Sequence, residues 1–261
     1  MRRLENIGDN IISTIFFSIL LLIWEVVAKL EVVPTYILPA PTRIIVTLIT
    51  NLPMLKEHII VTLMEALVGF TISIIFAIAI SIVMDSIPIV KKALYPLIIT
   101  SQTIPIITIA PLFAIWFGFG YLPKVVIVAL VCFFPITISL LEGLASVEED
   151  LLNLIKSMGA SKVQLYKIVK LPAAMPSFFS GLKISGTYSI TGATIGEWVG
   201  GKKGLGVYML RVKNSFATDK VFATIIIITL LSIAALKIIS FTEKRCMPWI
   251  YNQNQKIGEE Q

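Results

Sequence analysis

The chain has 261 residues, of which 56% are hydrophobic and 15% are charged, and its mean hydropathy is +0.89. Soluble domains usually carry about a quarter charged residues, so this composition excludes an ordinary soluble protein and indicates one with several membrane spans. The net charge of +6 suits a position beside anionic lipid headgroups and requires no nucleic-acid partner. Two distant cysteines and a single histidine match no disulfide framework and no metal site.

The first apolar segment, residues 11–28, predicts a membrane span near the start of the chain. It resembles a signal peptide in outline, but Trp24 and Glu25 occupy the place of the small residues at a cleavage site. We therefore expect a retained span. Residues 43–52 come next, and we expect Thr42 to cap them as a short helix that lies on the membrane surface.

Two later apolar segments carry small residues at every fourth position, the spacing that lets helices approach closely in lipid. Residues 66–84 have no charge and are nearly long enough to cross a hydrocarbon core of about 30 Å. Residues 175–196 are the second such segment. The small residues that we expect at helix contacts are Gly69, Ser73, Gly181, Ser185 and Ser189.

Residues 93–123 are charge-free but hold three prolines. Each proline removes a backbone donor that lipid cannot replace, so we expect a broken span inside a helix bundle. Gln102 and Thr103 lie just before Pro105, at mid-membrane depth. Two interpretations stay open: these side chains satisfy backbone groups freed at the kink, or they line a translocation pathway.

Two further apolar segments, residues 125–141 and 221–241, bring the predicted number of spans to six. The distribution of Lys and Arg does not fix the orientation of these spans, because basic residues lie in loops on both predicted sides of the membrane.

One long polar stretch, residues 146–172, interrupts the apolar segments. Ser146 and Ser161 each precede a Glu or Gln by three positions, which is the capping-box pattern, and Gly159 stands where a helix ends with positive φ. The stretch therefore predicts two short helices joined by a glycine turn. The first helix carries an apolar stripe made of Leu151, Leu154, Ile155 and Met158.

A DNA-binding helix-turn-helix has the same outline as this polar stretch. We set that interpretation aside because the acidic run at residues 148–150 offsets the nearby lysines and because the stretch lies between membrane spans. A solvated loop with two amphipathic helices is the plainer interpretation.

Several segments resemble a known family. Nine residues separate Gly159 from Val169-Lys170-Leu171-Pro172. This arrangement is similar to the cytoplasmic loop of ABC importer permease subunits, which has a Glu-Ala-Ala triad, a glycine and a hydrophobic-x-Leu-Pro ending. Asn153-Leu154-Ile155 replace the triad here. Other segments resemble, in order, the branch that imports sulfonates, taurine, nitrate and thiamine-type pyrimidines. They are Leu38-Pro39-Ala40-Pro41, Ile104-Pro105, Trp116-Phe117-Gly118, Gly196-Glu197-Trp198 and Gly204-Leu205-Gly206.

The resemblance implies an all-α polytopic membrane protein with six transmembrane helices and an ABC transmembrane type-1 domain at residues 57–241. Residues 1–56 would add a transmembrane helix and an interfacial segment, and residues 242–261 would form a cytoplasmic tail. The protein would be a multi-pass permease of the cell (cytoplasmic or inner) membrane, without enzymatic activity or a cofactor of its own.

The resemblance also implies partners. They are a second permease copy in a homodimer, cytoplasmic ATPase subunits that bind ATP, and an extracytoplasmic substrate-binding protein. The residues for which it implies coupling to the ATPase are Glu149, Asp150, Leu154, Ile155, Gly159, Ala160 and Ser161.

Glu197 lies in a glycine-rich segment, residues 196–202, that matches the first seven places of a phosphate-binding P-loop. The eighth place is Lys203 rather than Ser or Thr, so we reject ATP binding there. An ionisable group at this depth needs water or a partner. Glu197 is therefore either in a structural salt bridge, for example to Lys183 of another copy, or a contact on the translocation pathway, which the resemblance favours.

The substrate is indicated only by resemblance. Residues 196–200, 204–210 and 219–223 look more like those of permeases for the hydroxymethylpyrimidine precursor of thiamine than like those of nitrate permeases, with sulfonate, taurine or nitrate as the alternatives. A stand-alone secondary transporter would need paired buried ions and an internal repeat, and neither is visible. A membrane scaffold without a transport role would leave the proline-broken segment unexplained.

Overall fold

Helices account for all the regular secondary structure within residues 2–249, which are the residues that this computed structural model describes; their side chains are described from residue 11 onward. The apolar composition agrees with this all-α class, because a helix satisfies its backbone groups within the segment. The helices are α1 (Arg2–Lys29), α2 (Pro41–Ser86), α3 (Pro88–Ser101), α4 (Ile106–Phe117), α5 (Tyr121–Ala145), α6 (Glu149–Ser157), α7 (Lys162–Leu165), the π-helical turn η1 (Tyr166–Lys170), α8 (Leu171–Gly200), α9 (Leu205–Asn214) and α10 (Thr218–Cys246).

Four of these helices, α1, α2, α5 and α10, are long and apolar enough to cross a membrane. The pair α3 and α4 makes a fifth candidate, bent by 103° at its break. The expected interruption near Pro105 is thereby confirmed. Helix α8 has 30 residues but is not among the candidates by composition, so the predicted count of six spans is not confirmed.

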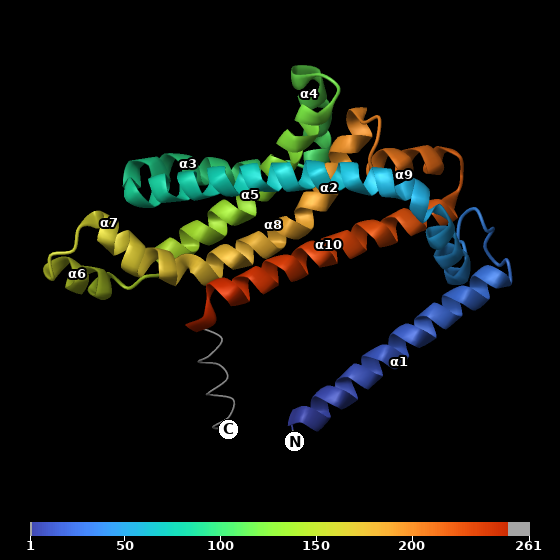
Figure 1. Ribbon diagram of the computed structural model, residues 1–261, viewed down its shortest axis with the longest axis horizontal. Helices are drawn as coiled ribbons and strands as arrows, with labels where there is room; N and C mark the ends of the chain where they lie inside the picture. The colour runs from blue at the N-terminus through green and yellow to red at the C-terminus, as the bar shows by residue number, and fades with distance from the viewer. Residues whose placement is uncertain (1, 250–261) are drawn as a thin grey trace.

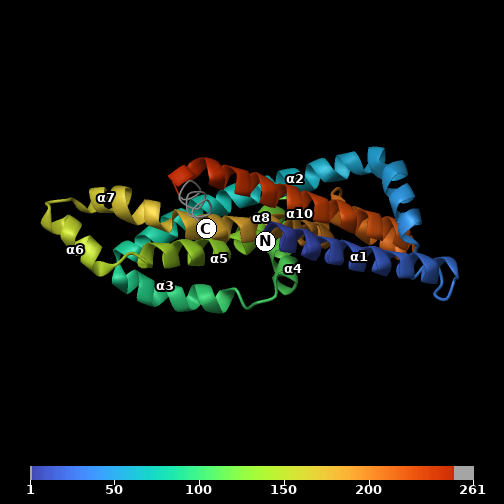
Figure 2. The ribbon, with the colours of Figure 1, turned by 90° about the horizontal axis from the view of Figure 1, so that it is seen from below.

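The centre of the molecule is formed by α2, α5, α8 and α10, which run beside one another (Figures 1 and 2). Helix α8 packs against α5, α2 and α10, and α5 packs against α2. The coupling candidates α6 and α7 lie at one end of this bundle and α9 lies toward the other (Figure 1). Helix α1 reaches away from the bundle and is attached near its last turns, where the Trp24 indole donates a hydrogen bond to the carbonyl of Pro39 at 3.1 Å.

The beginning of α2 differs from the sequence expectation. Residues 43–52 are not a separate surface helix but the first part of α2, which continues through Pro53 and is visibly bent in that region (Figures 1 and 2). A proline removes one backbone hydrogen bond, which kinks a helix without ending it when the neighbouring bonds hold. Thr42 does not cap the helix either, because its hydroxyl donates to Glu25 of α1 at 2.7 Å.

The small residues of α2 and α8 are buried where these helices meet α5. A Cβ on Gly69 would lie 2.5 Å from the Cβ of Val128, and one on Gly181 would lie 2.8 Å from the carbonyl oxygen of Pro135. Ser185 donates from its hydroxyl to the carbonyl of Cys132 at 2.9 Å. These contacts bring the backbones close together within a single chain, which is how helices associate in lipid.

We expect Ser185→Leu to destabilise the bundle, because Ser185 is fully buried against α5 and the larger side chain overpacks the contact. Overpacking of this kind costs about 1–3 kcal/mol. Thermal unfolding of the detergent-purified protein measures the loss. Ile184→Leu is the matched control, since Ile184 is 45% exposed and an isomeric side chain fits there. Equal unfolding temperatures for the two variants would contradict close packing at this position.

Candidate functional site

The polar stretch between α5 and α8 folds into α6, a turn, α7 and η1. Gly159 has a φ of +85°, which only glycine adopts without strain, and it closes the turn after α6. The capping box at the start of α7 is confirmed: the backbone N–H of Gln164 donates to the Ser161 hydroxyl at 3.3 Å, and the N–H of Ser161 donates to the Gln164 side chain at 2.8 Å.

The capping box expected at the start of α6 is wrong. Glu148 is the residue before the helix, and no side chain caps it. The Ser146 hydroxyl donates instead to the carbonyl of Gly143 at 2.9 Å, so it satisfies the end of α5 rather than the start of α6. Helix α6 is still supported electrostatically, because Glu149 and Asp150 lie in its first turn and Lys156 in its last.

The apolar face of α6 has no cover within the described part of the chain. No residue of α6 is buried, and Leu154 and Met158 on this face are 57% and 76% exposed. Figures 1 and 2 show α6 at the far end of the molecule, beyond the bundle. An amphipathic helix that presents such a face can bind a groove on another protein. Helices α7, η1 and α8 follow one another without a break, so this region is joined directly to α8.

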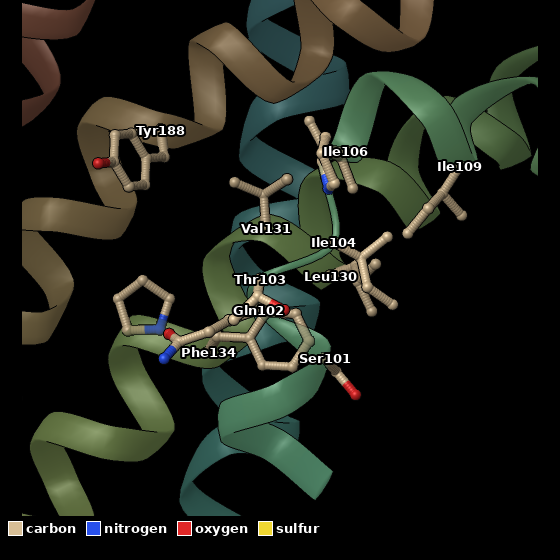
Figure 3. A pocket seen from close by; sticks show the side chains of 12 residues that line it. Ser101, Gln102, Thr103, Ile104, Ile106, Ile109, Leu130, Val131, Phe134 and Tyr188 are labelled. Carbon is tan, nitrogen blue, oxygen red and sulfur yellow. The ribbon is translucent and has the colours of Figure 1, made fainter.

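The break between α3 and α4 borders a pocket of about 300 Å³ (Figure 3). Gln102 and Thr103 line it together with Phe134 of α5 and Tyr188 of α8. The Thr103 hydroxyl donates to the carbonyl of Thr100 at 2.7 Å, so it satisfies a backbone group at the break. The same side chain thus serves the kink and faces the pocket, and the two interpretations of these residues are compatible.

Glu197 lies near the end of α8 and is 1% exposed. Its carboxylate accepts hydrogen bonds from the Thr62 hydroxyl and from the backbone N–H of Gly206, each at 2.5 Å. The Thr62 hydroxyl in turn accepts from the N–H of Leu205 at 2.9 Å. Two side chains from α8 and α2 therefore satisfy free N–H groups in the first turn of α9, where a negative charge is also favoured by the helix dipole.

Neighbouring residues extend this attachment of α9. The backbone N–H of Gly204 donates to Nδ1 of His58 at 3.0 Å, and Lys203 forms an ion pair with Glu57. Gly204 has a φ of +126°, and a Cβ there would collide with the Glu197 carboxylate. The expected partner Lys183 instead pairs with Glu243 of the same chain. The contacts of Glu197 support its structural interpretation, and residues 196–200 are helical rather than a phosphate-binding loop.

Sequence reasoning missed a buried ion pair between α2 and α5. The Lys124 ammonium lies 2.7 Å from a carboxylate oxygen of Glu65, and both side chains are almost completely buried. Lys124 also lies against Gly196, one residue before Glu197. The available signal was that Glu65 and Lys124 flank two uncharged apolar segments, which makes ions of opposite sign at span ends candidates for pairing.

An all-helical bundle with four or five candidate spans, one of them bent beside a pocket, indicates a multi-pass membrane protein. The comparisons with known proteins identify the family. The model of the family described as "Binding-protein-dependent transport system inner membrane component" matches residues 69–246. The chain belongs to this family, and it is the permease subunit of an ABC importer, a multi-pass protein of the inner membrane and not an enzyme.

Three relatives show that the chain is similar to permeases of the branch that includes taurine and thiamine-precursor importers. The chain is 38% identical to the formylaminopyrimidine transport permease protein ThiX of Halalkalibacterium halodurans, over 90% of this chain and 94% of that protein. It is 31% identical to the riboflavin transport system permease protein RibX of Chloroflexus aurantiacus, over 88% and 87%. It is 28% identical to the taurine transport system permease protein TauC of Escherichia coli, over 89% and 87%.

Solved structures support the fold. An inward-facing structure of the MetNI methionine ABC transporter contains a chain that matches with a TM-score of 0.59 at 17% identity. The match covers 72% of this chain and 97% of that one. At this identity the likeness concerns the fold alone, which is the all-helical fold of an ABC permease.

We expect Glu197→Ala to loosen the first turn of α9, because the Gly206 N–H and the Thr62 hydroxyl lose their acceptor. Loss of the hydrogen bond from the Gly206 N–H should speed amide exchange of the peptide that spans residues 203–209 by up to about tenfold. Hydrogen–deuterium exchange measures this rate, and the peptides of α5 are the internal control.

Glu197→Gln is the matched variant, since its amide oxygen still accepts from Gly206. We expect its exchange rate to lie between those of Glu197→Ala and the unmodified protein. Unchanged exchange in Glu197→Ala would show that this carboxylate does not hold α9.

Proposed function

We propose that two copies of this chain form the translocation pathway of an ABC importer whose two cytoplasmic ATPase subunits bind ATP and whose solute is delivered by an extracytoplasmic binding protein. The observation that carries this proposal is the uncovered apolar face of α6 at one end of the bundle. Exposed Leu154 and Met158 suit the anchors of a helix that docks into a groove, and membership of the family supplies the kind of partner.

The coupling region extends from α6 to the start of α7. Glu149, Asp150 and Leu154 lie on α6, and all three side chains are exposed. The residues that we propose at or beside the ATPase contact are Glu149, Asp150, Leu154, Ile155, Gly159, Ala160 and Ser161. Closure of the ATPase subunits on ATP would displace this region, and the continuous helix from Lys162 to Gly200 would carry the displacement into the bundle.

We propose six spans, with α8 and the bent α3–α4 pair added to the four apolar helices. Helix α8 lies between α2, α5 and α10, so its small and polar residues face other helices rather than lipid. In this arrangement residues 57–241 make the transport domain, residues 1–56 an added helix with its connection, and residues 242–261 a cytoplasmic tail.

The pathway would pass the break between α3 and α4, where Gln102 and Thr103 face the pocket. Polar side chains and a broken backbone at membrane depth are tolerated where they line a cavity. A direct contact between Glu197 and the solute stays a prediction, and it requires a conformation in which Thr62 and Gly206 release the carboxylate.

We propose that the solute is a small aminopyrimidine precursor of thiamine. The relative at 38% identity is a formylaminopyrimidine permease. The pocket beside the break holds two aromatic rings, Phe134 and Tyr188, and its lining residues include no Lys or Arg. Aromatic rings suit a planar heteroaromatic ring, whereas sulfonate, taurine and nitrate carry a negatively charged group that is usually bound by cationic side chains.

We expect Leu154→Asp to abolish co-purification of the ATPase subunit. A charge would replace an apolar anchor at the centre of the exposed face, and removal of such an anchor typically costs about 2 kcal/mol or more. Affinity purification of the tagged permease after co-expression with its ATPase subunit measures the stoichiometry.

Asn153→Asp is the matched control, because it introduces the same carboxylate on the opposite, polar side of α6. It should leave the stoichiometry unchanged. A lower yield of Leu154→Asp with normal stoichiometry would contradict docking through this face. A cysteine at position 160, in a Cys246→Ser background, should crosslink to the ATPase.

The solute is tested by uptake into proteoliposomes that contain the complex and its binding protein. We expect hydroxymethylpyrimidine and formylaminopyrimidine to compete for one transport activity, and taurine and nitrate not to compete at a hundred times the concentration, about 2.7 kcal/mol of discrimination. Transport of taurine or nitrate without pyrimidine transport would contradict the proposed solute and would leave the role as a permease intact.

A further inference from the structure

Asp85 lies in the last turn of α2, where it holds the helix to the π-helical turn η1. Its carboxylate oxygen Oδ2 lies 2.7 Å from the Lys170 ammonium and accepts a second hydrogen bond from the Tyr166 hydroxyl. The side chains of Asp85 and Lys170 are only 7% and 14% exposed. The neighbouring Ser86 hydroxyl lies 3.0 Å from the Tyr166 hydroxyl. We call this group of four residues the clasp.

The clasp is built from charge-assisted contacts that are shielded from water. The Lys170 ammonium lies 5.2 Å from the centroid of the Tyr166 ring as well as against Asp85, so the cation meets a carboxylate and an aromatic face. Burial and the hydrogen bond to Asp85 raise the pKa of Tyr166 to about 12, so this hydroxyl remains a donor at neutral pH. Shielding makes such contacts stronger than exposed ion pairs.

The clasp joins the end of α2 to η1, the turn that links the coupling region to α8. Tyr166 and Lys170 are the first and last residues of η1, which joins α7 to α8. The π-helical register, with the Leu171 N–H bonded to the Tyr166 carbonyl, is a local irregularity in an otherwise continuous helix. Within residues 11–249, the hydrogen bonds and ion pairs between α2 and η1 are those of Asp85 and Ser86.

We propose that Asp85 is a positioning residue that carries the movement of the coupling region into α2. Helix α8 receives that movement through chain continuity, whereas α2 receives it through the clasp. The proposal rests on the proposed function, since the movement is the one imposed by the ATPase. Helix α2 also packs against α5 and α8, but the clasp is its hydrogen-bonded and ionic contact with η1. Loss of the clasp would therefore weaken the response of α2 to the ATPase, while α8 would still follow it.

Spin labels on α2 and α8 of the complex with its ATPase test this proposal without a transported solute. A cysteine replaces Phe76 of α2 or Ile184 of α8, which are 60% and 45% exposed, in a Cys246→Ser background. In the homodimer each label gives one distance between copies, measured by electron paramagnetic resonance without nucleotide and with ATP plus vanadate. In the otherwise unmodified protein we expect both distances to change with nucleotide.

Asp85→Asn removes the charge and keeps the size of the side chain. We expect the nucleotide-dependent shift of the α2 label to be largely lost and that of the α8 label to persist. Glu142→Gln, which removes an exposed carboxylate at the end of α5, is the matched control and should change neither shift.

Charge reversal distinguishes a positioning role of Asp85 from a purely structural one. Asp85→Lys combined with Lys170→Asp restores opposite charges at the two positions, and we expect the α2 shift to return at least in part. Retention of the full α2 shift in Asp85→Asn would overturn the proposal, as would equal loss at both labels. Absence of nucleotide-dependent shifts at both labels in the parent complex would instead contradict the proposed function, and the proposal with it.

Discussion

The requirement that polar groups inside a membrane find partners within the protein determines how this chain is arranged. Lys124 and Glu65 pair between α5 and α2, and Glu197 binds Thr62 and the first turn of α9. Each of these contacts joins helices that are distant in sequence. Since apolar burial does not drive helices together in lipid, these polar contacts and the close approach of small residues are what fix the bundle.

The polar contacts gather at the two ends of the helix pair α2 and α8. Asp85 binds η1, just before α8 begins, and Thr62 binds Glu197 near the point where α8 ends. Between these contacts both helices pack closely against α5, α2 through Gly69 and α8 through Ser185. A pair of helices that is held at both ends and closely packed between can move as one body, which is what transmission from one side of a membrane to the other requires.

The parts of the fold that depend on local chemistry could be predicted from the sequence. Gly159 and the Ser161 capping box were predictable because a glycine turn and an N-cap involve only neighbouring residues. The roles of Ser146 and Thr42 could not be predicted, because their hydroxyls donate to other groups. These are the carbonyl of Gly143 in α5 and the carboxylate of Glu25 in α1. The Lys124–Glu65 pair and the clasp of Asp85 join residues far apart in sequence. The positions of Glu65 and Lys124 at span ends made them candidates for pairing, but local sequence does not specify which partner each takes.

Acidic partners compensate some of the basic residues at the end of the molecule that holds α9. Lys203 pairs with Glu57, and Arg43 lies 3.6 Å from Asp219. Part of the positive charge that obscures the orientation in the sequence is thus compensated within the folded protein. At the other end, the lysine that follows the coupling helices, Lys170, is used by the clasp, whereas the apolar face of α6 is left without cover. The exposed apolar face at that end is the observation on which the proposed docking of the ATPase rests.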